Sequence, residues 1–301
     1  MATNDTKIRQ SQPGRKATGK AQMHRTRSEH LAAIVYGAAV GDALGVPFEF
    51  RDRDTFTCDG MAEGGAHRMP AGTFSDDTSL LIATCDSLRA NHGKINIEDM
   101  RRRFRSWLYE GKYTVDGAAF DVGNATAVAL DAGCGCTHER SNGNGSLMRI
   151  APLALTDADD DQIRAVSAIT HAHKLSTESC VAFVGILRQL LGGASLPRAI
   201  EENVPDDERF SFMLDIAKTP RSDVRSSGFV LDTLKASLWC ALHTGNYRDC
   251  VLAAVNLGHD SDTTACVAGA LAGALYGSRC IPAEWMAALR GKDVIDGCLF
   301  G

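Results

Sequence analysis

Two short acidic stretches carry the residue types that bind divalent metal ions. Gly258-His-Asp-Ser-Asp-Thr263 places two carboxylates two residues apart, with hydroxyl side chains between and after them. Gly72-Thr-Phe-Ser-Asp-Asp-Thr78 has a similar pattern, in which hydroxyl side chains stand before and after two adjacent aspartates. Carboxylate and hydroxyl oxygens without a cluster of histidine or cysteine suit Mg²⁺ or Mn²⁺. Each stretch alone also fits a simpler interpretation, in which an aspartate or threonine caps a helix.

Both stretches lead directly into apolar runs of helical length. Residues 265–277 are too apolar for a surface helix, which predicts a buried helix with Asp260 and Asp262 in or just before its first turn. Residues 79–88 follow Asp76 and Asp77 in the same way. The positive end of a helix favours an anion by roughly 0.3–1 kcal/mol. That accounts for one aspartate, whereas two beside a buried helix repel each other and require a cation.

The two helix starts are nearly two hundred residues apart, and we expect them to converge from opposite sides. Four aspartates at one place can hold about two divalent cations, and paired metals about 3.5–4 Å apart are a known catalytic device. Asp42 is a further charged residue in an apolar stretch, and Glu49 is another.

The apolar periodicity is helical nearly throughout and strand-like alternation is absent, which predicts an all-α fold. A capping box over residues 26–29 starts the first helix, and Gly45-Val-Pro47 ends it. Further helices are expected at 96–110, just after Asp121, and at 159–169, 177–192, 196–203, 207–217, 228–243 and 247–257. One domain is expected over residues 28–301, preceded by a basic, flexible extension over residues 1–27.

Charge is distributed unevenly along the 301 residues, of which 44% are apolar and 23% charged. The net charge is -5, yet residues 1–27 hold seven Lys or Arg and one acid. The remaining chain is therefore acidic and has no basic surface for nucleic acid. The basic extension is interpreted either as a solvated tail or as an arm that binds a partner protein.

The ten cysteines show no spacing typical of a disulfide framework, which favours a reducing cytoplasm. Four of them, Cys85, Cys180, Cys240 and Cys266, lie in apolar helical runs and are expected in the core. Cys134-Gly-Cys136-Thr-His138 does not have the usual zinc spacing. The sequence has no run of 18 uncharged apolar residues and no apolar signal core, so no association with a membrane is expected.

Two further motifs are weaker signals of a ligand site. The glycine-rich loop over residues 141–146 can bring backbone N–H groups against a phosphate, although a flexible turn explains it equally well. Thr170-His-Ala-His173 places two histidines two residues apart, so they do not share a helix face. This spacing is more typical of a helix end than of a ligand pair.

Taken together, the motifs resemble those of the ADP-ribosylglycohydrolases, the group typified by the dinitrogenase-reductase-activating glycohydrolase. The matching motifs follow one another along the chain in the same order as in members of the family, and they cover residues 31–290. They are Gly37-Ala-Ala-Val-Gly-Asp-Ala-Leu-Gly-Val-Pro-Phe-Glu49, Gly72-Thr-Phe-Ser-Asp-Asp-Thr78, Asp121-Val-Gly-Asn-Ala-Thr126, Gly143-Asn-Gly-Ser-Leu-Met-Arg149, Thr170-His171, Gly228-Phe-Val-Leu-Asp-Thr-Leu234 and Gly258-His-Asp-Ser-Asp-Thr263.

The resemblance implies a compact all-α fold around a dinuclear Mg²⁺ or Mn²⁺ site. The implied metal ligands are Ser75, Asp76, Asp77, Asp260, Asp262 and Thr263, and the implied catalytic residues are Glu49, Asp76, Asp77 and Asp262. The implied substrate-binding residues are His171, Ser141, Gly143, Asn144 and Gly145 at the diphosphate, Phe229 at the adenosine end and Asp121 near the ribose. Ser75 stands where many members have threonine, and Ala127 where an arginine is frequent.

The resemblance also implies an activity: metal-dependent hydrolysis of the bond between ADP-ribose and a modified protein side chain, with arginine expected first. Its transition state has oxocarbenium character. A metal depresses the pKa of a carboxylate that binds it, so Glu49 is the preferred proton-transfer residue. Two alternatives stay open. One is an immunity protein that blocks an ADP-ribosyltransferase toxin through residues 1–27; the other is a metal-dependent phosphohydrolase that cuts the pyrophosphate.

Overall fold

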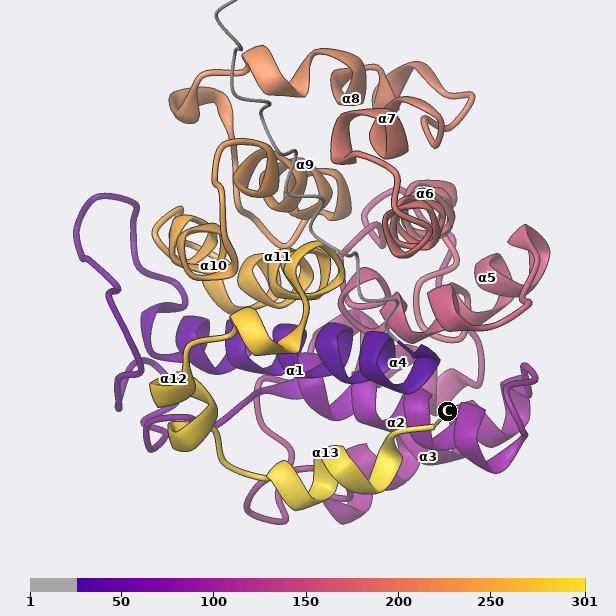
Figure 1. Cartoon of the computed structure of the whole chain (residues 1–301). Helices are drawn as coiled ribbons and strands as arrows, with labels where there is room; N and C mark the ends of the chain where they lie inside the picture. The colour runs from indigo at the N-terminus through magenta and orange to yellow at the C-terminus, as the bar shows by residue number, and fades with distance from the viewer. Residues whose placement is uncertain (1–25, 301) are drawn as a thin grey trace, which may run out of the picture.

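Two apolar helices, α1 (Arg27–Gly45) and α11 (Ser261–Tyr276), pack along each other at the centre of the fold (Figure 1). The computed structural model describes residues 26–300, and this range contains helices and three isolated β-bridges but no strand. The predicted all-α fold is confirmed.

The remaining helices cover the central pair on two sides. On one side lie α6 (Lys174–Leu191), α9 (Val230–Leu242) and α10 (Tyr247–Val255); on the other lie α2 (Asp76–Ala90), α3 (Ile97–Glu110) and α13 (Lys292–Cys298) (Figure 1). The shorter helices are α4 (Asn124–Ala132), α5 (Asp160–Ser167), α7 (Leu196–Glu201), α8 (Phe212–Asp215) and α12 (Ala283–Ala288). The acidic starts of α2 and α11 thus belong to helices that both contact α1.

Glycines on α1 allow the two central helices to approach at backbone distance. A Cβ added at Gly37 would lie 2.3 Å from the carbonyl oxygen of Gly269, and one added at Gly41 would lie 2.1 Å from that of Ala265. At Gly45 it would lie 2.3 Å from the Cα of Asp262. Real Cβ atoms do not approach other atoms this closely, so glycine is required wherever the helices cross. The last of these glycines brings the first turn of α11, with its aspartate, against the end of α1.

The central helix α1 also passes a test for membrane spans based on length and composition. With the 3-10 turn that follows, Val46–Phe48, it has a mean hydropathy of 1.6 over its most apolar window. In this structure 94% of that window is buried inside the protein. Its apolar character is accounted for by its position in the core.

Most predicted helices form, with shifted ends. The capping box is confirmed, because the Thr26 hydroxyl accepts from the Glu29 N–H at 3.2 Å and the Glu29 carboxylate accepts from the Thr26 N–H at 2.7 Å. The helix expected at 177–192 begins earlier, at Lys174, because the His173 side chain caps it. Cys85, Cys180, Cys240 and Cys266 are buried and free, as expected.

The prediction of a helix over residues 207–217 is wrong. Two 3-10 turns, Glu208–Phe210 and Ile216–Lys218, flank the single turn of α8. The buried side chains in this segment are Phe210, Met213 and Ile216, which are spaced by three residues. That spacing aligns side chains on a 3-10 helix with three residues per turn.

Residues 1–25 and 301 lie outside the part of the chain that the structure describes. The predicted flexible extension over residues 1–27, and its proposed role as a partner-binding arm, fall almost wholly on these residues. Both stay predictions.

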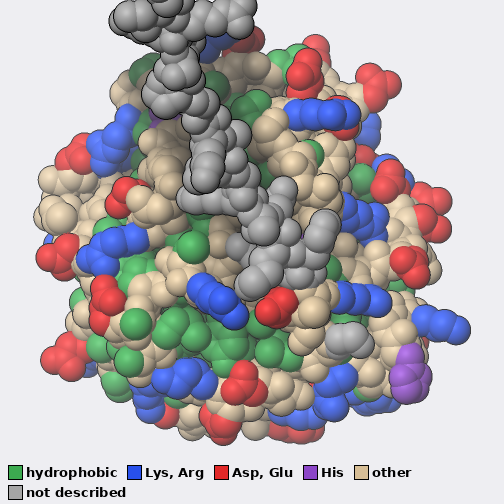
Figure 2. Space-filling view, viewed as in Figure 1, with side chains coloured by type: hydrophobic (Ala, Val, Ile, Leu, Met, Phe, Trp, Pro, Cys, Tyr) green, Lys and Arg blue, Asp and Glu red, His purple; other side chains and the backbone are tan. Residues whose placement is uncertain are grey.

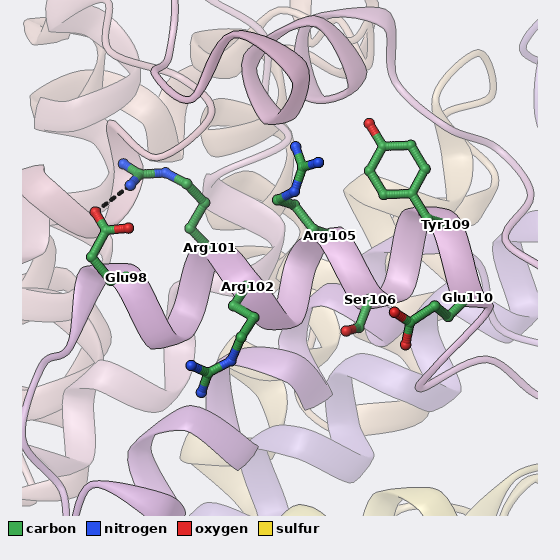
Figure 3. Close-up of a pocket in the computed structure, with 7 residues that line it drawn as sticks. All are labelled: Glu98, Arg101, Arg102, Arg105, Ser106, Tyr109 and Glu110. Carbon is green, nitrogen blue, oxygen red and sulfur yellow. Dashed lines mark hydrogen bonds and ion pairs between the residues drawn. The ribbon is translucent and has the colours of Figure 1, made fainter.

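Charges of both signs are mixed on the surface. Figure 2 shows acidic and basic side chains interspersed over the described residues of one face. A shallow hollow of about 330 Å³ runs along α3, and its lining includes Arg101, Arg102, Arg105 and Tyr109, whose side chains are spread along the helix (Figure 3). Its arginines have partners within the protein: Arg101 pairs with Glu98, Arg102 pairs with Asp99, and Arg105 donates to a backbone carbonyl of α4. This hollow therefore offers no uncommitted basic group.

We predict that Gly41→Ala lowers the free energy of unfolding by about 1–3 kcal/mol, because an added methyl group must push α11 away. The matched control is Gly297→Ala in α13, where an added Cβ meets no atom within 4 Å. That change is expected to be neutral or stabilising by about 0.5–1 kcal/mol, the helix preference of alanine. Urea unfolding of both variants measures the difference; equal stabilities would contradict the close helix crossing.

Candidate active site

The first turns of α2 and α11 meet beside the end of α1. Ser75 is the N-cap of α2 and Asp260 is the N-cap of α11. The Thr263 hydroxyl donates to Oδ2 of Asp77 at 3.3 Å, which joins the two helix starts directly. Oxygens of Asp77 and Asp262 come within 4.8 Å of each other and of a third carboxylate. The expected convergence of the two acidic stretches is therefore confirmed.

The third carboxylate belongs to Asp42 of α1, which the sequence analysis singled out by charge but did not place in the site. Its oxygens accept from the Ser75 N–H at 2.9 and 3.0 Å, from the Thr78 N–H at 3.0 Å and from the Thr78 hydroxyl at 2.6 Å. Asp42 thus caps α2 from another helix. Burial raises the pKa of this carboxyl to about 6 against the opposing effect of those hydrogen bonds. A lone charge among small apolar residues was the available sequence signal.

The buried aspartates are electrostatically unfavourable by themselves. Burial, followed by repulsion from neighbouring carboxylates, raises the pKa of Asp76, Asp77 and Asp262 well above the ordinary value. Oδ1 of Asp77 and Oδ2 of Asp262 are buried and have no hydrogen-bond partner. Repelling carboxylates with unused oxygen lone pairs fit a divalent cation bound by oxygen ligands.

A cleft of about 270 Å³ opens above these aspartates. Nine of the predicted site residues line it: Glu49, Asp76, Asp121, Gly143, Asn144, Gly145, His171, Asp260 and Thr263. Ser75, Asp77 and Asp262 are buried and do not line the cleft. Ser141 and Phe229 are also outside it, although Phe229 forms an isolated bridge with Gly143 at its edge.

Glu49 reaches the cleft from the loop after α1. Burial, then repulsion from Asp121 and Asp260, raises the pKa of Glu49 to about 9. Its Oε2 lies 2.5 Å from Nε2 of His67, and the same nitrogen lies 3.6 Å from Oδ1 of Asp121. His67 was missed by sequence reasoning, since it lies in a polar loop without a motif. It ties together the two loops that carry these carboxylates.

The glycine-rich loop packs against His171. A Cβ added at Gly145 would lie 2.7 Å from Cε1 of the His171 ring, so the close approach requires glycine there. Asn144 fixes the loop to the acidic centre, because its Nδ2 donates to Oδ2 of Asp260 at 2.7 Å and to the Thr233 hydroxyl at 2.9 Å.

A hydrogen-bond chain sets the tautomer of His171. Nη2 of the fully buried Arg149 donates to the Thr170 hydroxyl at 2.8 Å, and this hydroxyl lies 2.9 Å from Nδ1 of His171. Among the described residues the Thr170 hydroxyl has no other acceptor, so we assign its hydrogen to Nδ1. The remaining N–H, at Nε2, then faces Gly143 and Gly145. Burial, and next the charge of Arg149, lowers the pKa of His171 to about 3, so the ring is a neutral donor.

Comparison with known proteins identifies the arrangement. Residues 23–299 match the family model described as ADP-ribosylglycohydrolase.

The chain belongs to the ADP-ribosylglycohydrolase family.

Two curated relatives illustrate the similarity. An ADP-ribosylarginine hydrolase from Serratia proteamaculans is 34% identical over 268 residues, which cover 83% of this chain and 72% of the relative. The ADP-ribosyl-[dinitrogen reductase] glycohydrolase of Rhodospirillum rubrum is 32% identical over 273 residues, which cover 85% and 88%. A solved structure titled ADP-ribosylglycohydrolase-related protein complex superposes with a TM-score of 0.78 at 30% identity, covering 90% of this chain and 96% of the other.

This ADP-ribosylglycohydrolase is thus a hydrolase of a metal-dependent family, and its acidic clusters supply oxygen ligands that can hold metal ions. The helix starts hold the hydroxyls and carboxylates, the loop after α1 holds the glutamate, and the glycine loop with His171 forms another part of the cleft.

We predict that Thr170→Val lowers the catalytic rate on an ADP-ribosyl substrate about 10-fold while the protein stays folded. Without the hydroxyl, Nδ1 of His171 loses its hydrogen-bond donor, so the ring is no longer held in the tautomer with its hydrogen on Nε2, facing the cleft. A hydrogen bond from this Nε2–H to a charged group of the substrate would then be weakened, and such bonds contribute about 1.5–3 kcal/mol. Thr170→Ser keeps the hydroxyl and should retain activity. Steady-state kinetics and ¹⁵N NMR of the imidazole measure both effects. Equal tautomers and rates in the two variants would refute the role of this chain.

Proposed function

We propose that this ADP-ribosylglycohydrolase cleaves the bond between ADP-ribose and an arginine side chain of a modified protein. The observation that carries the proposal is the meeting of two acidic helix starts below a cleft lined by Glu49, Asp121 and the glycine loop. Arginine as the acceptor is supported by the named activity of the Serratia proteamaculans relative at 34% identity. The carboxylates at the cleft mouth also suit a cationic acceptor.

We propose further that two Mg²⁺ or Mn²⁺ ions bind at the acidic centre. Their ligands would be Ser75, Asp76, Asp77, Asp260, Asp262 and Thr263, which are all oxygen donors. When bound, such ions polarise a water molecule and orient a sugar diol. The buried, unpartnered oxygens of Asp77 and Asp262 support this assignment.

Other groups of the protein would transfer protons, stabilise the transition state and bind the rest of the substrate. Glu49 holds or transfers a proton at the cleft, because its buried carboxylate lies at the cleft beside His67, and burial, then the neighbouring carboxylates, raise its pKa before a metal ion binds. Asp121 lies near the substrate ribose, and its charge favours the positive oxocarbenium-like transition state. The Nε2–H of His171 and the backbone of the loop, Ser141 to Gly145, bind the diphosphate, while Phe229 lies towards the adenosine end.

The activity is tested with two defined substrates. We expect the protein with Mg²⁺ to release ADP-ribose from an ADP-ribosyl-arginine peptide and to leave an ADP-ribosyl-serine peptide largely intact. Asp76→Ala and Asp262→Ala should each lose more than nine tenths of the activity, because each removes an oxygen ligand from a different helix start. Asp161→Ala, whose carboxylate is 93% exposed on α5, is the matched control. Mass spectrometry of the products separates glycosidic from pyrophosphate cleavage.

Circular dichroism is the check that these variants fold, and we expect spectra like that of the unmodified protein. Retention of more than a tenth of the activity in both would rule out the proposed centre, and release of AMP would favour a phosphohydrolase.

Metal removal gives a test that does not depend on turnover. In the chelated protein the raised carboxyl pKa values mean that the folded state binds more protons than the unfolded state above pH about 4. Stability should therefore fall as pH rises from about 4 through 6 and beyond. Added Mg²⁺ or Mn²⁺ should restore stability near pH 7, by about 2.7 kcal/mol at a hundredfold excess over the dissociation constant.

Thermal unfolding at several pH values, with EDTA or with each ion, measures this effect, and Zn²⁺ should stabilise less because the site has no nitrogen or sulfur ligand. Asp262→Asn should flatten the pH dependence. A melting temperature that is independent of both pH and metal would contradict the site.

A further inference from the structure

Phe50 is a large aromatic residue left exposed at the mouth of the cleft. Its side chain is 66% exposed, and it lines the cleft next to Glu49. Its backbone φ is 64°, in the left-handed region that bulky residues rarely adopt. The conformation is held by a reciprocal pair of hydrogen bonds, from the Phe50 N–H to the His259 carbonyl at 2.7 Å and from the His259 N–H to the Arg51 carbonyl at 2.8 Å.

This arrangement has no evident structural benefit. A left-handed conformation of a residue other than glycine costs about 1–3 kcal/mol and is commonly found at functional sites. A buried aromatic ring would offset that cost, but this ring is mostly in solvent. An exposed ring at the mouth of a cleft is placed to contact a ligand that enters it.

The surroundings of Phe50 suit a planar cation. Its ring centroid lies 5.9 Å from that of His67, which lies 5.3 Å from that of Phe120. His67 is thus flanked by two aromatic rings, with its Nε2 directed at the carboxylates of Glu49 and Asp121. A planar ring that carries nitrogen atoms is therefore already accommodated between aromatic rings and acids. An arginine guanidinium has the same planar shape, more N–H donors and a permanent charge.

We propose that Phe50 determines acceptor specificity by stacking on the guanidinium of the modified arginine, beside Glu49 and Asp121. A cation within about 6 Å of an aromatic centroid is attracted to the face of the ring. A serine acceptor is neutral and lacks a planar group, so it gains nothing from this contact. The inference rests on the proposed arginine-directed activity and adds the residue that recognises the acceptor.

The test compares Phe50→Leu with Phe50→Tyr. Leucine keeps apolar volume and loses the aromatic face, whereas tyrosine keeps both. For Phe50→Leu we expect KM for an ADP-ribosyl-arginine peptide to rise about 3- to 30-fold, the range for exposed to desolvated cation–π contacts, with kcat within twofold. Inhibition by free ADP-ribose, which has no acceptor group, should not change. Phe50→Tyr should behave as the unmodified protein, and so should Leu214→Ala, a control at a residue 61% exposed on α8.

The outcomes separate the inference from the function on which it rests. An unchanged KM in Phe50→Leu, while the unmodified protein hydrolyses the arginine peptide, overturns the specificity role and leaves the function intact. An equal change in ADP-ribose inhibition overturns it as well, because the ring would then shape the whole cleft. If the unmodified protein does not hydrolyse the arginine peptide, the proposed function fails and this inference fails with it.

Discussion

The close crossing of α1 and α11 is the constraint on which the site depends. Backbone meets backbone at Gly37, Gly41 and Gly45, so no side chain separates the two helices. As a result, the Asp42 carboxylate of α1 and the Asp262 carboxylate of α11 lie within 4.8 Å of a shared neighbour, Asp77. Side chains in the crossing would move these groups apart and leave three unrelated helix ends.

The same crossing creates an electrostatic problem. Carboxylates that water would separate are buried together, and burial, followed by their mutual repulsion, raises their pKa values. The cost of burying the Asp42 carboxylate is offset by four hydrogen bonds from the start of α2. Asp77 and Asp262, in contrast, each keep a buried oxygen without a partner. A group of this kind is stable when a cation supplies the missing interactions. The fold and the proposed metal chemistry are therefore two consequences of one packing arrangement.

The rim of the cleft is built from loops and not from helix starts. Around the acidic centre the functional groups lie at helix starts, whereas Glu49, Phe50, His67 and Asp121 come from loops. Phe50, Asp121 and His259 all have left-handed backbones without being glycine. Strained loop residues above regular helix starts suit the proposed site, in which the helix starts hold the reacting bond and the rim selects the acceptor.

Local sequence patterns were sufficient to predict the fold class, the two acidic helix starts and the family of this protein. Helical periodicity indicated an all-α fold, hydroxyl and carboxylate patterns marked the starts of α2 and α11, and the motif order indicated the family. These features depend on neighbouring residues, which a sequence displays directly. Where burial followed a three-residue spacing, at Phe210, Met213 and Ile216, the helical prediction failed because local spacing admitted a 3-10 alternative.

Only the tertiary structure decided which distant groups meet. Asp42 caps a helix that begins over thirty residues later, His67 approaches Asp121 across more than fifty residues, and Arg149 acts on His171 through Thr170. Each contact depends on how helices and loops pack, and no motif records it. Sequence specifies which residues can perform chemistry; packing at the α1–α11 crossing decides which of them share one site, because burial and distance set their pKa values and partners.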